Sequence, residues 1–287
     1  MEPPGQRVSL IFVGQRNFYT EYLTEWLADL TDLKGIIWTA SARHRLRSHL
    51  GFVWKRSRRL GLFRVLSEIL YFIGVQPLRY RDGIAVKQII AEARKALPAD
   101  ISLPEALEVP NLRADSIRSY LDERRPDIIL TQCINEIVPE SVYSLPKIGC
   151  FVYHEGIVPE YRGKYGTHWA IFNGDYDKIG ASLIKVGPGI DLGQVAFTEY
   201  VWPQGRGHSA NWWEHKVLFL ALPRLKQWIQ DVSAGRVPLQ EQKGKYPLYS
   251  LPRFGHLFKR AARVEAYERW LAQNHPPAPT ASPPAGS

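Results

Sequence analysis

The chain of 287 residues has few of the features that mark membrane-spanning, disulfide-rich or metal-binding proteins. Its two cysteines, Cys133 and Cys150, are too few for a disulfide framework and lack the CxxC spacing of a metal site. We interpret both as small buried hydrophobic residues and predict no metal site. The longest apolar runs, such as residues 67–75, are too short to cross a bilayer. Residues 1–14 have no apolar signal region with a cleavage site, so we expect a cytoplasmic protein.

Acidic residues are absent from residues 43–64, a stretch that contains eight Arg and Lys. The net charge is +9, and the chain outside this stretch is nearly balanced, so the basicity belongs to one element. Aromatic residues such as Trp54 are mixed with the basic ones, which predicts one or two basic amphipathic helices over residues 43–75. Three interpretations stay open: a lid that grips phosphates, an anchor on a membrane surface, or a solvated helical insertion.

The rest of the chain alternates strand and helix patterns, and its 45% hydrophobic content is ample for a core. Residues 7–14, 17–30 and 35–40 read as a β-α-β opening, which predicts an α/β fold with a mostly parallel twisted sheet flanked by helices. We expect further strands at residues 127–133, 148–154, 178–186 and 193–202, the last two as an antiparallel edge pair, and helices at residues 87–97, 116–126, 169–172 and 212–232.

We divide the chain into three parts. Residues 1–202 form the predicted catalytic domain, with residues 43–75 as an insertion. Residues 203–274 form a short helical or irregular C-terminal extension. Residues 275–287 are rich in proline and are predicted to be a disordered tail.

The most informative residues are His154, near the carboxyl end of a predicted strand, and Asp191, in the Gly-rich sequence GPGIDLGQ. Ligands in open α/β sheets bind at the carboxyl ends of strands, and an imidazole there can accept a proton from an attacking amine. A carboxylate beside it would orient the imidazole, raise its pKa or position a water. Taken singly, a buried structural His and an Asx-turn Asp are the alternatives. Between them, Arg162 in the VPEYRG turn would brace the turn or hold an anion.

Residues 127–201 resemble the formyltransferase family that uses 10-formyltetrahydrofolate. That family carries Asn-x-His on a strand, then a Leu-Pro-x-Tyr/Trp-Arg-Gly turn, a Trp-Ala-Ile-x-Asn-Gly stretch and Ile-Asp-x-Gly. Here these motifs read Val152-Tyr153-His154, VPEYRG, WAIFNG and IDLG, in the same order and with similar spacing. The resemblance implies a Rossmann-like catalytic domain and attack of a primary amine on the formyl carbon of the co-substrate.

The resemblance also implies roles for individual residues. His154 would be the general base and oxyanion partner, and Asp191 its carboxylate partner. The cofactor-binding residues would be Cys133, Ile134, Asn135, Glu136, Ile137, Val138, Gly187 and Gly189. The substrate-binding residues would be Gly14, Gln15, Arg16, Asn17, Tyr161, Arg162 and Gly163.

Val152 departs from the family pattern, because it stands where the family has the Asn that donates to the formyl oxygen. Loss of one oxyanion donor lowers the rate by about 10²–10³. Three explanations are open: another donor replaces it, the chemistry is that of a related one-carbon transferase with an altered group or acceptor, or the site binds without catalysing. The candidate replacement donors are Gln132, Asn135, Thr167 and His168.

The sequence favours a small amine as the acceptor, such as an amino sugar linked to a nucleotide. The residues after Asp231 are too few for the C-terminal barrel of methionyl-tRNA formyltransferases, and phosphate contacts alone give only sequence-independent affinity, so we do not expect a nucleic-acid partner. Residues 235–252 resemble the segment with which nucleotide-sugar formyltransferases close their site. A membrane surface is a further candidate partner, through residues 43–75.

Overall fold

A single sheet forms the centre of the computed structural model, which describes residues 7–40, 46–204, 209–244 and 246–274. Within these residues the sheet has seven strands in the order β3-β2-β1-β4-β5-β6-β7, and β5 pairs with β6, and β6 with β7, in antiparallel fashion. The mostly parallel, Rossmann-like α/β fold expected from the sequence is confirmed. The strands are β1 (Ser9–Gln15), β2 (Asp32–Thr39), β3 (Ala106–Val109), β4 (Ile128–Gln132), β5 (Gly149–Glu155), β6 (Gly180–Lys185) and β7 (Val195–Tyr200).

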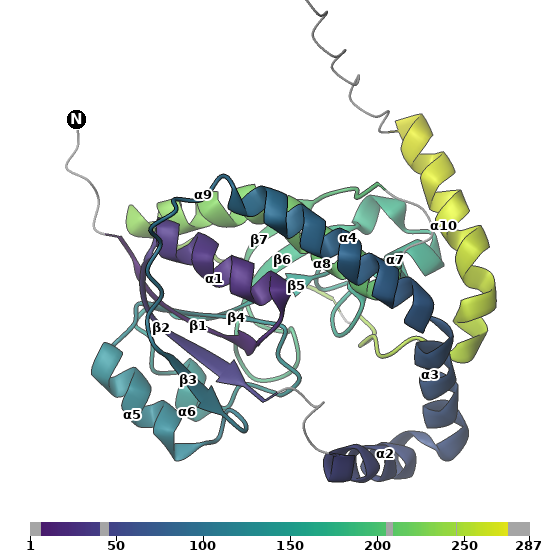
Figure 1. Ribbon diagram of the computed structural model, residues 1–287, viewed down its shortest axis with the longest axis horizontal. Helices are drawn as coiled ribbons and strands as arrows, with labels where there is room; N and C mark the ends of the chain where they lie inside the picture. The colour runs from purple at the N-terminus through teal and green to yellow at the C-terminus, as the bar shows by residue number, and fades with distance from the viewer. Residues whose placement is uncertain (1–6, 41–45, 205–208, 245, 275–287) are drawn as a thin grey trace, which may run out of the picture.

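The two faces of the sheet are covered by different helices (Figure 1). One face packs under α1 (Phe18–Leu30), α4 (Gln76–Arg94), α8 (Ala210–Leu220) and α9 (Leu222–Ser233), and the other packs against α5 (Asp115–Arg124) and the short α6 (Glu140–Tyr143). Side chains alternate between these faces along each strand, so Leu10 and Ile11 belong to different core clusters. This alternation decides which helix layer each residue at a strand end meets.

The C-terminal helices share the larger core cluster with the sheet. Trp213 of α8, Trp228 of α9 and Tyr267 of α10 (Phe254–Asn274) are buried in the same cluster as Phe12 and Leu130. The predicted division after residue 202 stays a prediction, and residues 275–287 lie outside the described residues.

The predicted single helix at residues 212–232 is wrong, because the chain forms two helices there. The first ends at Leu220, and Pro223 stands in the first turn of α9. Proline has no N–H to continue the preceding helix, whereas its fixed φ suits a helix start.

The basic insertion forms two helices, α2 (Leu46–Leu60) and α3 (Leu62–Gly74), followed directly by α4; residues 43–45 lie outside the described residues. α3 packs beside α10 at the periphery of the molecule (Figure 1). Glu68 of α3 is buried and forms a two-point ion pair with Arg56 of α2, at 2.7 and 3.0 Å, so α2 and α3 are joined by charges that face inward. Every helix among the described residues is too short or too polar to cross a lipid bilayer.

Candidate functional site

His154 is the next-to-last residue of β5 and is buried, with 8% of its surface exposed. Its Nε2 lies 3.1 Å from the carbonyl oxygen of Tyr161. A carbonyl only accepts hydrogen bonds, so this contact places the single proton of the neutral imidazole on Nε2, and the lone pair is then on Nδ1. Among the described residues, Nδ1 has no hydrogen-bond partner. The structure therefore gives His154 a free basic nitrogen at the carboxyl end of the sheet.

Gly156 makes the contact between His154 and Tyr161 possible. A Cβ at this position would lie 2.4 Å from the Tyr161 carbonyl oxygen and 2.8 Å from His154 Nε2. Its φ of +147° is also one that side chains rarely adopt. The glycine thus allows the chain that follows β5 to fold back onto the imidazole.

Asp191 holds the other side of the same turn. Its Oδ2 accepts a hydrogen bond of 2.9 Å from the backbone N–H of Gly163, and its own backbone has a φ of +51°. No hydrogen bond joins Asp191 to His154 in this structure. The predicted direct orientation of the imidazole by this carboxylate is therefore not what the structure shows. The two side chains bracket the turn at residues 161–163.

A later segment of the chain clamps this turn and the Asp191 loop together. Gln242 donates to the carbonyl oxygens of Asp191 and Gly193, at 2.9 and 2.7 Å. The backbone N–H of Tyr249 donates to the Arg162 carbonyl at 3.0 Å. The predicted role of residues 235–252 as a cover over the site is consistent with these contacts, although the residues that make them were not singled out in the sequence.

The predicted substrate residues in the turn have internal partners. Tyr161 is 1% exposed, stacks on Tyr249 and donates from its hydroxyl to Asp175 at 2.6 Å. Arg162 donates to the Ile190 carbonyl at 3.3 Å, so it braces the turn, as one of the two interpretations expected. Gly163 is held by Asp191. These three residues build the turn, and Arg162 Nε is left buried without a hydrogen-bond partner among the described residues.

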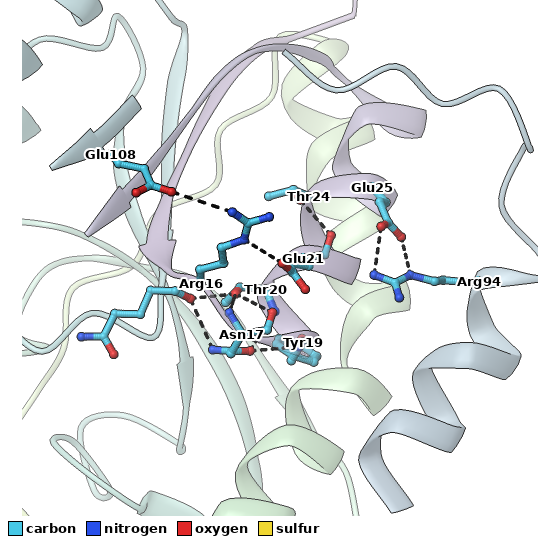
Figure 2. A network of polar contacts seen from close by, with 10 residues as sticks. Arg16, Asn17, Tyr19, Thr20, Glu21, Thr24, Glu25, Arg94 and Glu108 are labelled. Atoms are coloured by element: carbon cyan, nitrogen blue, oxygen red, sulfur yellow. Dashed lines mark hydrogen bonds and ion pairs between the residues drawn. The ribbon is translucent and has the colours of Figure 1, made fainter. Parts of the chain in front are cut away.

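The loop after β1 is also largely occupied by internal contacts (Figure 2). Asn17 caps α1 through its side chain, and Arg16 pairs with Glu21 at 2.8 Å and approaches Glu108 at 3.8 Å. Gly14 lets β1 approach β4, since a Cβ there would lie 2.6 Å from the Gln132 carbonyl oxygen. The predicted substrate contacts of this loop reduce to Arg16, whose side chain is 63% exposed, and Gln15.

A polar chain joins three loops at the carboxyl edge of the sheet. Lys164 Nζ donates to Asn135 Oδ1 at 2.7 Å, and Asn135 Nδ2 donates to Gln15 Oε1 at 3.1 Å. Neighbouring protein atoms partly desolvate the Lys164 ammonium and so lower its pKa, although the residue keeps contact with solvent. Sequence reasoning predicted Gln15 and Asn135 but missed Lys164, although it directly follows the VPEYRG motif.

The loop at residues 133–138 supplies both packing and exposed apolar surface. Ile134 and Val138 pack on the smaller core cluster, and Glu136 accepts from the Leu112 N–H at 3.0 Å. Burial raises the pKa of Cys133 to about 12, so its thiol stays neutral. Ile137 is 60% exposed.

The loop at residues 187–193 exposes Ile190 by 40% and Leu192 by 50%. Gly187 has open space around its Cα, and Gly189 has a φ of +101°. Val186, which precedes this loop, packs on the same core cluster as Ile134. The two loops predicted to bind the cofactor therefore lie at one edge of the sheet and expose apolar side chains there.

Val152 lies on the same face of β5 as His154, because the two residues are two positions apart. Thr131 pairs with Val152, so Gln132 points to the opposite face. Thr167 and His168 are buried in α7 (Gly166–Asn173). Of the four candidate replacement donors, Asn135 is the one that is exposed at the strand ends.

Glu155 points to the face opposite His154 and was not predicted to matter. Its two carboxylate oxygens accept from the backbone N–H groups of Gly166 and Thr167, at 2.9 and 3.0 Å. Burial raises the pKa of Glu155 to about 8, and the charge of Glu214 adds to this, while the two backbone bonds oppose it. Glu214 of α8 also interacts electrostatically with Lys164. An apolar pocket lies farther along this layer, where Trp212, Tyr19 and Ile90 line it.

The fold and the site define a class: an α/β protein with a basic imidazole and a carboxylate-held turn at the carboxyl edge of its sheet. Residues 81–202 match the model of the formyl transferase family, which is less than half of the chain. This match confirms the resemblance to the formyltransferase family that the motifs predicted. Formyltransferases are one-carbon transferases.

Curated relatives include methionyl-tRNA formyltransferases. The protein from Thermotoga maritima is 26% identical over 163 residues, 55% of this chain and 51% of that protein. The protein from Alkaliphilus oremlandii is 31% identical over 90 residues, 31% of this chain and 29% of that protein. The chain thus spans at most about half the length of these relatives.

Two solved structures share the fold. A 4-N formyltransferase from Francisella tularensis has a TM-score of 0.51 and 13% identity, over 94% of this chain and 90% of that one. Glycinamide ribonucleotide transformylase 1 from Symbiobacterium toebii has a TM-score of 0.52 and 11% identity, over 85% of this chain and 98% of that one. At such identities the likeness shows the fold alone.

Proposed function

We propose that this protein transfers a formyl group from 10-formyltetrahydrofolate to the primary amine of a small acceptor, such as an amino sugar linked to a nucleotide. The observation that carries the proposal is His154, whose Nδ1 is unpartnered at the end of β5 while Nε2 is held by the Tyr161 carbonyl. An imidazole fixed in this tautomer can accept the proton that an amine loses as it attacks a carbonyl carbon. The family match over residues 81–202 supports the same reaction class.

The residues at the sheet edge fit a reduced folate. Ile137, Ile190 and Leu192 offer exposed apolar surface for a flat ring, and the Asn135 amide and Lys164 ammonium offer polar groups beside it. Bound there, the folate would supply an activated formyl group. The chain's own contributions are to hold the turn with Asp191, to keep Nδ1 of His154 free and to exclude water with the segments around Gln242 and Tyr249.

Val152 favours a second candidate, a formyltransferase-like protein that binds ligands without catalysing. Valine has no donor for a developing oxyanion. Asn135 is the exposed one of the predicted replacement donors, and its amide would first have to leave Gln15. A related one-carbon transferase that uses a different group is the remaining alternative.

The test uses the full chain in calorimetric titration with 5-formyltetrahydrofolate and in an amine-panel assay with 10-formyltetrahydrofolate. We expect the wild type to bind and turn over, and His154→Ala to bind with similar affinity while turnover falls by at least about 10²-fold. Val152→Asn should raise the turnover rate, because it adds an oxyanion donor on the face of His154. Folate binding with no turnover in wild type or Val152→Asn would favour the binding protein, and no folate binding would overturn both proposals.

A further inference from the structure

The outward side of α3 carries only apolar residues. Their spacing places them on one helical face, and they are exposed by between 38% and 88%. Of the two charged residues of the helix, Glu68 is 2% exposed and paired with Arg56, and the partly exposed Arg64 lies 3.6 Å from the same carboxylate. The exposed apolar residues are Leu62, Phe63, Leu66, Ile69, Leu70 and Ile73.

An ordinary surface helix keeps its charges outward and its apolar side chains on the core. α3 buries Val65 and Tyr71, yet it also buries its carboxylate and leaves apolar side chains outward. α10 packs against α3 and donates from the Phe254 N–H to Ser67 Oγ at 3.0 Å. Phe258 of α10 is 72% exposed and forms a ring contact with Phe254. Exposed apolar side chains gathered on two helices that pack together mark an interaction surface.

The elements next to α3 in the chain and in space also expose basic residues. α2 precedes α3 through Gly61 and exposes Arg58 and Arg59, and α10 exposes Lys259 directly after Phe258. Trp54, four residues before Arg58 on the same side of α2, is 66% exposed. Apolar side chains flanked by Arg, Lys and Trp are the composition of helices that lie on anionic membranes.

We propose that the outward faces of α3 and the start of α10 dock this protein on the surface of an anionic phospholipid bilayer. Charge identifies the occupant: the chain carries a net charge of +9, and Arg58 and Arg59 are exposed among the α2 side chains whose burial the structure describes. α3 has 13 residues, about 20 Å of helix, so it lies along the interface and does not cross the roughly 30 Å hydrocarbon core. The proposal does not depend on formyl transfer.

The test is co-sedimentation of the full chain with vesicles of phosphatidylcholine alone and of phosphatidylcholine mixed with phosphatidylglycerol. We expect the anionic vesicles to bind more protein, and added salt to weaken the difference. Phe63→Glu should lower the partition coefficient about tenfold or more, because it places a charge in the apolar face. Leu103→Glu, at another exposed apolar residue, is the matched control and should not change it.

Arg58→Gln tests the contribution of charge and should weaken binding to anionic vesicles about fivefold. Lys226→Gln, at an exposed residue of α9, is the matched control and should weaken binding much less. Circular dichroism checks that each variant is folded. Equal binding to both vesicle types, no binding to either, or an unchanged Phe63→Glu overturns the proposal. A dimer in sedimentation velocity that Phe63→Glu converts to monomer, without vesicle binding, assigns the face to a second copy of the chain instead.

Discussion

At the scale of single residues, the Asp191 carboxylate holds the Gly163 N–H and not the imidazole of His154. The structural and electrostatic contributions of this carboxylate can therefore be separated. Asn keeps an acceptor oxygen for the Gly163 N–H but has no charge, whereas Ala has neither.

We predict that Asp191→Asn keeps the stability of the wild type to within about 1 kcal/mol, while Asp191→Ala loses about 1–2 kcal/mol, because the turn N–H loses its partner. Urea unfolding measures both changes. If the charge acts in catalysis, Asp191→Asn loses turnover with unchanged folate affinity. Equal activity of Asp191→Asn and wild type would restrict Asp191 to a structural role.

The sequence could predict those site residues whose partners lie near them along the chain. His154 and Asp191 belong to short motifs, so their place at strand ends could be read from strand patterns. Glu214 reaches Glu155 from α8, about sixty positions later, and only the packing of α8 on the sheet brings them together. No local pattern carries that information.

At the scale of elements, the basic insertion is held by the buried pair of Glu68 and Arg56, with Arg64 at 3.6 Å. Arg56 also donates to Ser250 Oγ at 2.8 Å, which ties α2 to the segment that covers the site. Arg56 is thus a structural residue, and a test of membrane charge should use Arg58 or Arg59 instead.

We predict that Glu68→Gln destabilises the insertion by about 2 kcal/mol, because Arg56 and Arg64 lose their buried counter-charge. Hydrogen exchange of the amides in α2 and α3 should accelerate strongly, while those of β1 and β4 stay protected. Glu265→Gln, which removes an exposed partner of Arg269 on α10, is the matched control and should change little. Unchanged exchange in α2 and α3 would show that the ion pair is not what holds them.

The elements that were predicted well are those with strong periodic patterns. The buried apolar runs of β1, β4 and β5 could be recognised as strands of a parallel sheet. β3 has only four residues, ALEV, and too short a pattern to be seen. α10 buries Val264, Tyr267 and Leu271 at helical spacing, but charged residues of both signs lie between them, and the region was expected only as a helical or irregular extension.

At the scale of the whole molecule, two buried groups in and beside α7 make stability depend on pH in opposite directions. Burial lowers the pKa of His168 to about 3, with His256 and Arg260 adding to the effect. Burial raises the pKa of Glu155 to about 8, with Glu214 adding to it. Both groups are therefore neutral in the folded protein near pH 5.5.

The sign follows from proton binding in each state. Between pH 6.5 and 3, the unfolded His168 binds a proton that the folded one does not, so its contribution is lost as pH falls. Between pH 4.5 and 8, the folded Glu155 binds a proton that the unfolded one has released, so its contribution is lost as pH rises. From pH 4.5 to 6.5 the two changes in stability oppose each other. Below pH 4.5 only His168 lowers the stability, and above pH 6.5 only Glu155 does.

We predict a broad stability maximum near pH 4.5–6.5, with roughly 2 kcal/mol lost from Glu155 by pH 8 and a similar loss from His168 on the acid side. Thermal and urea unfolding across pH measure the dependence of stability on pH.

His168→Phe should remove much of the loss of stability at acid pH, because Phe cannot be protonated and fits among Tyr71, Phe172 and Trp169. Glu214→Gln should reduce the loss at pH 8 and leave stability at pH 5 unchanged, because Glu155 is protonated there. If Glu214→Gln leaves the loss of stability at pH 8 unchanged, burial alone sets the pKa of Glu155. If His168→Phe leaves the loss of stability at acid pH unchanged, that loss comes from other groups.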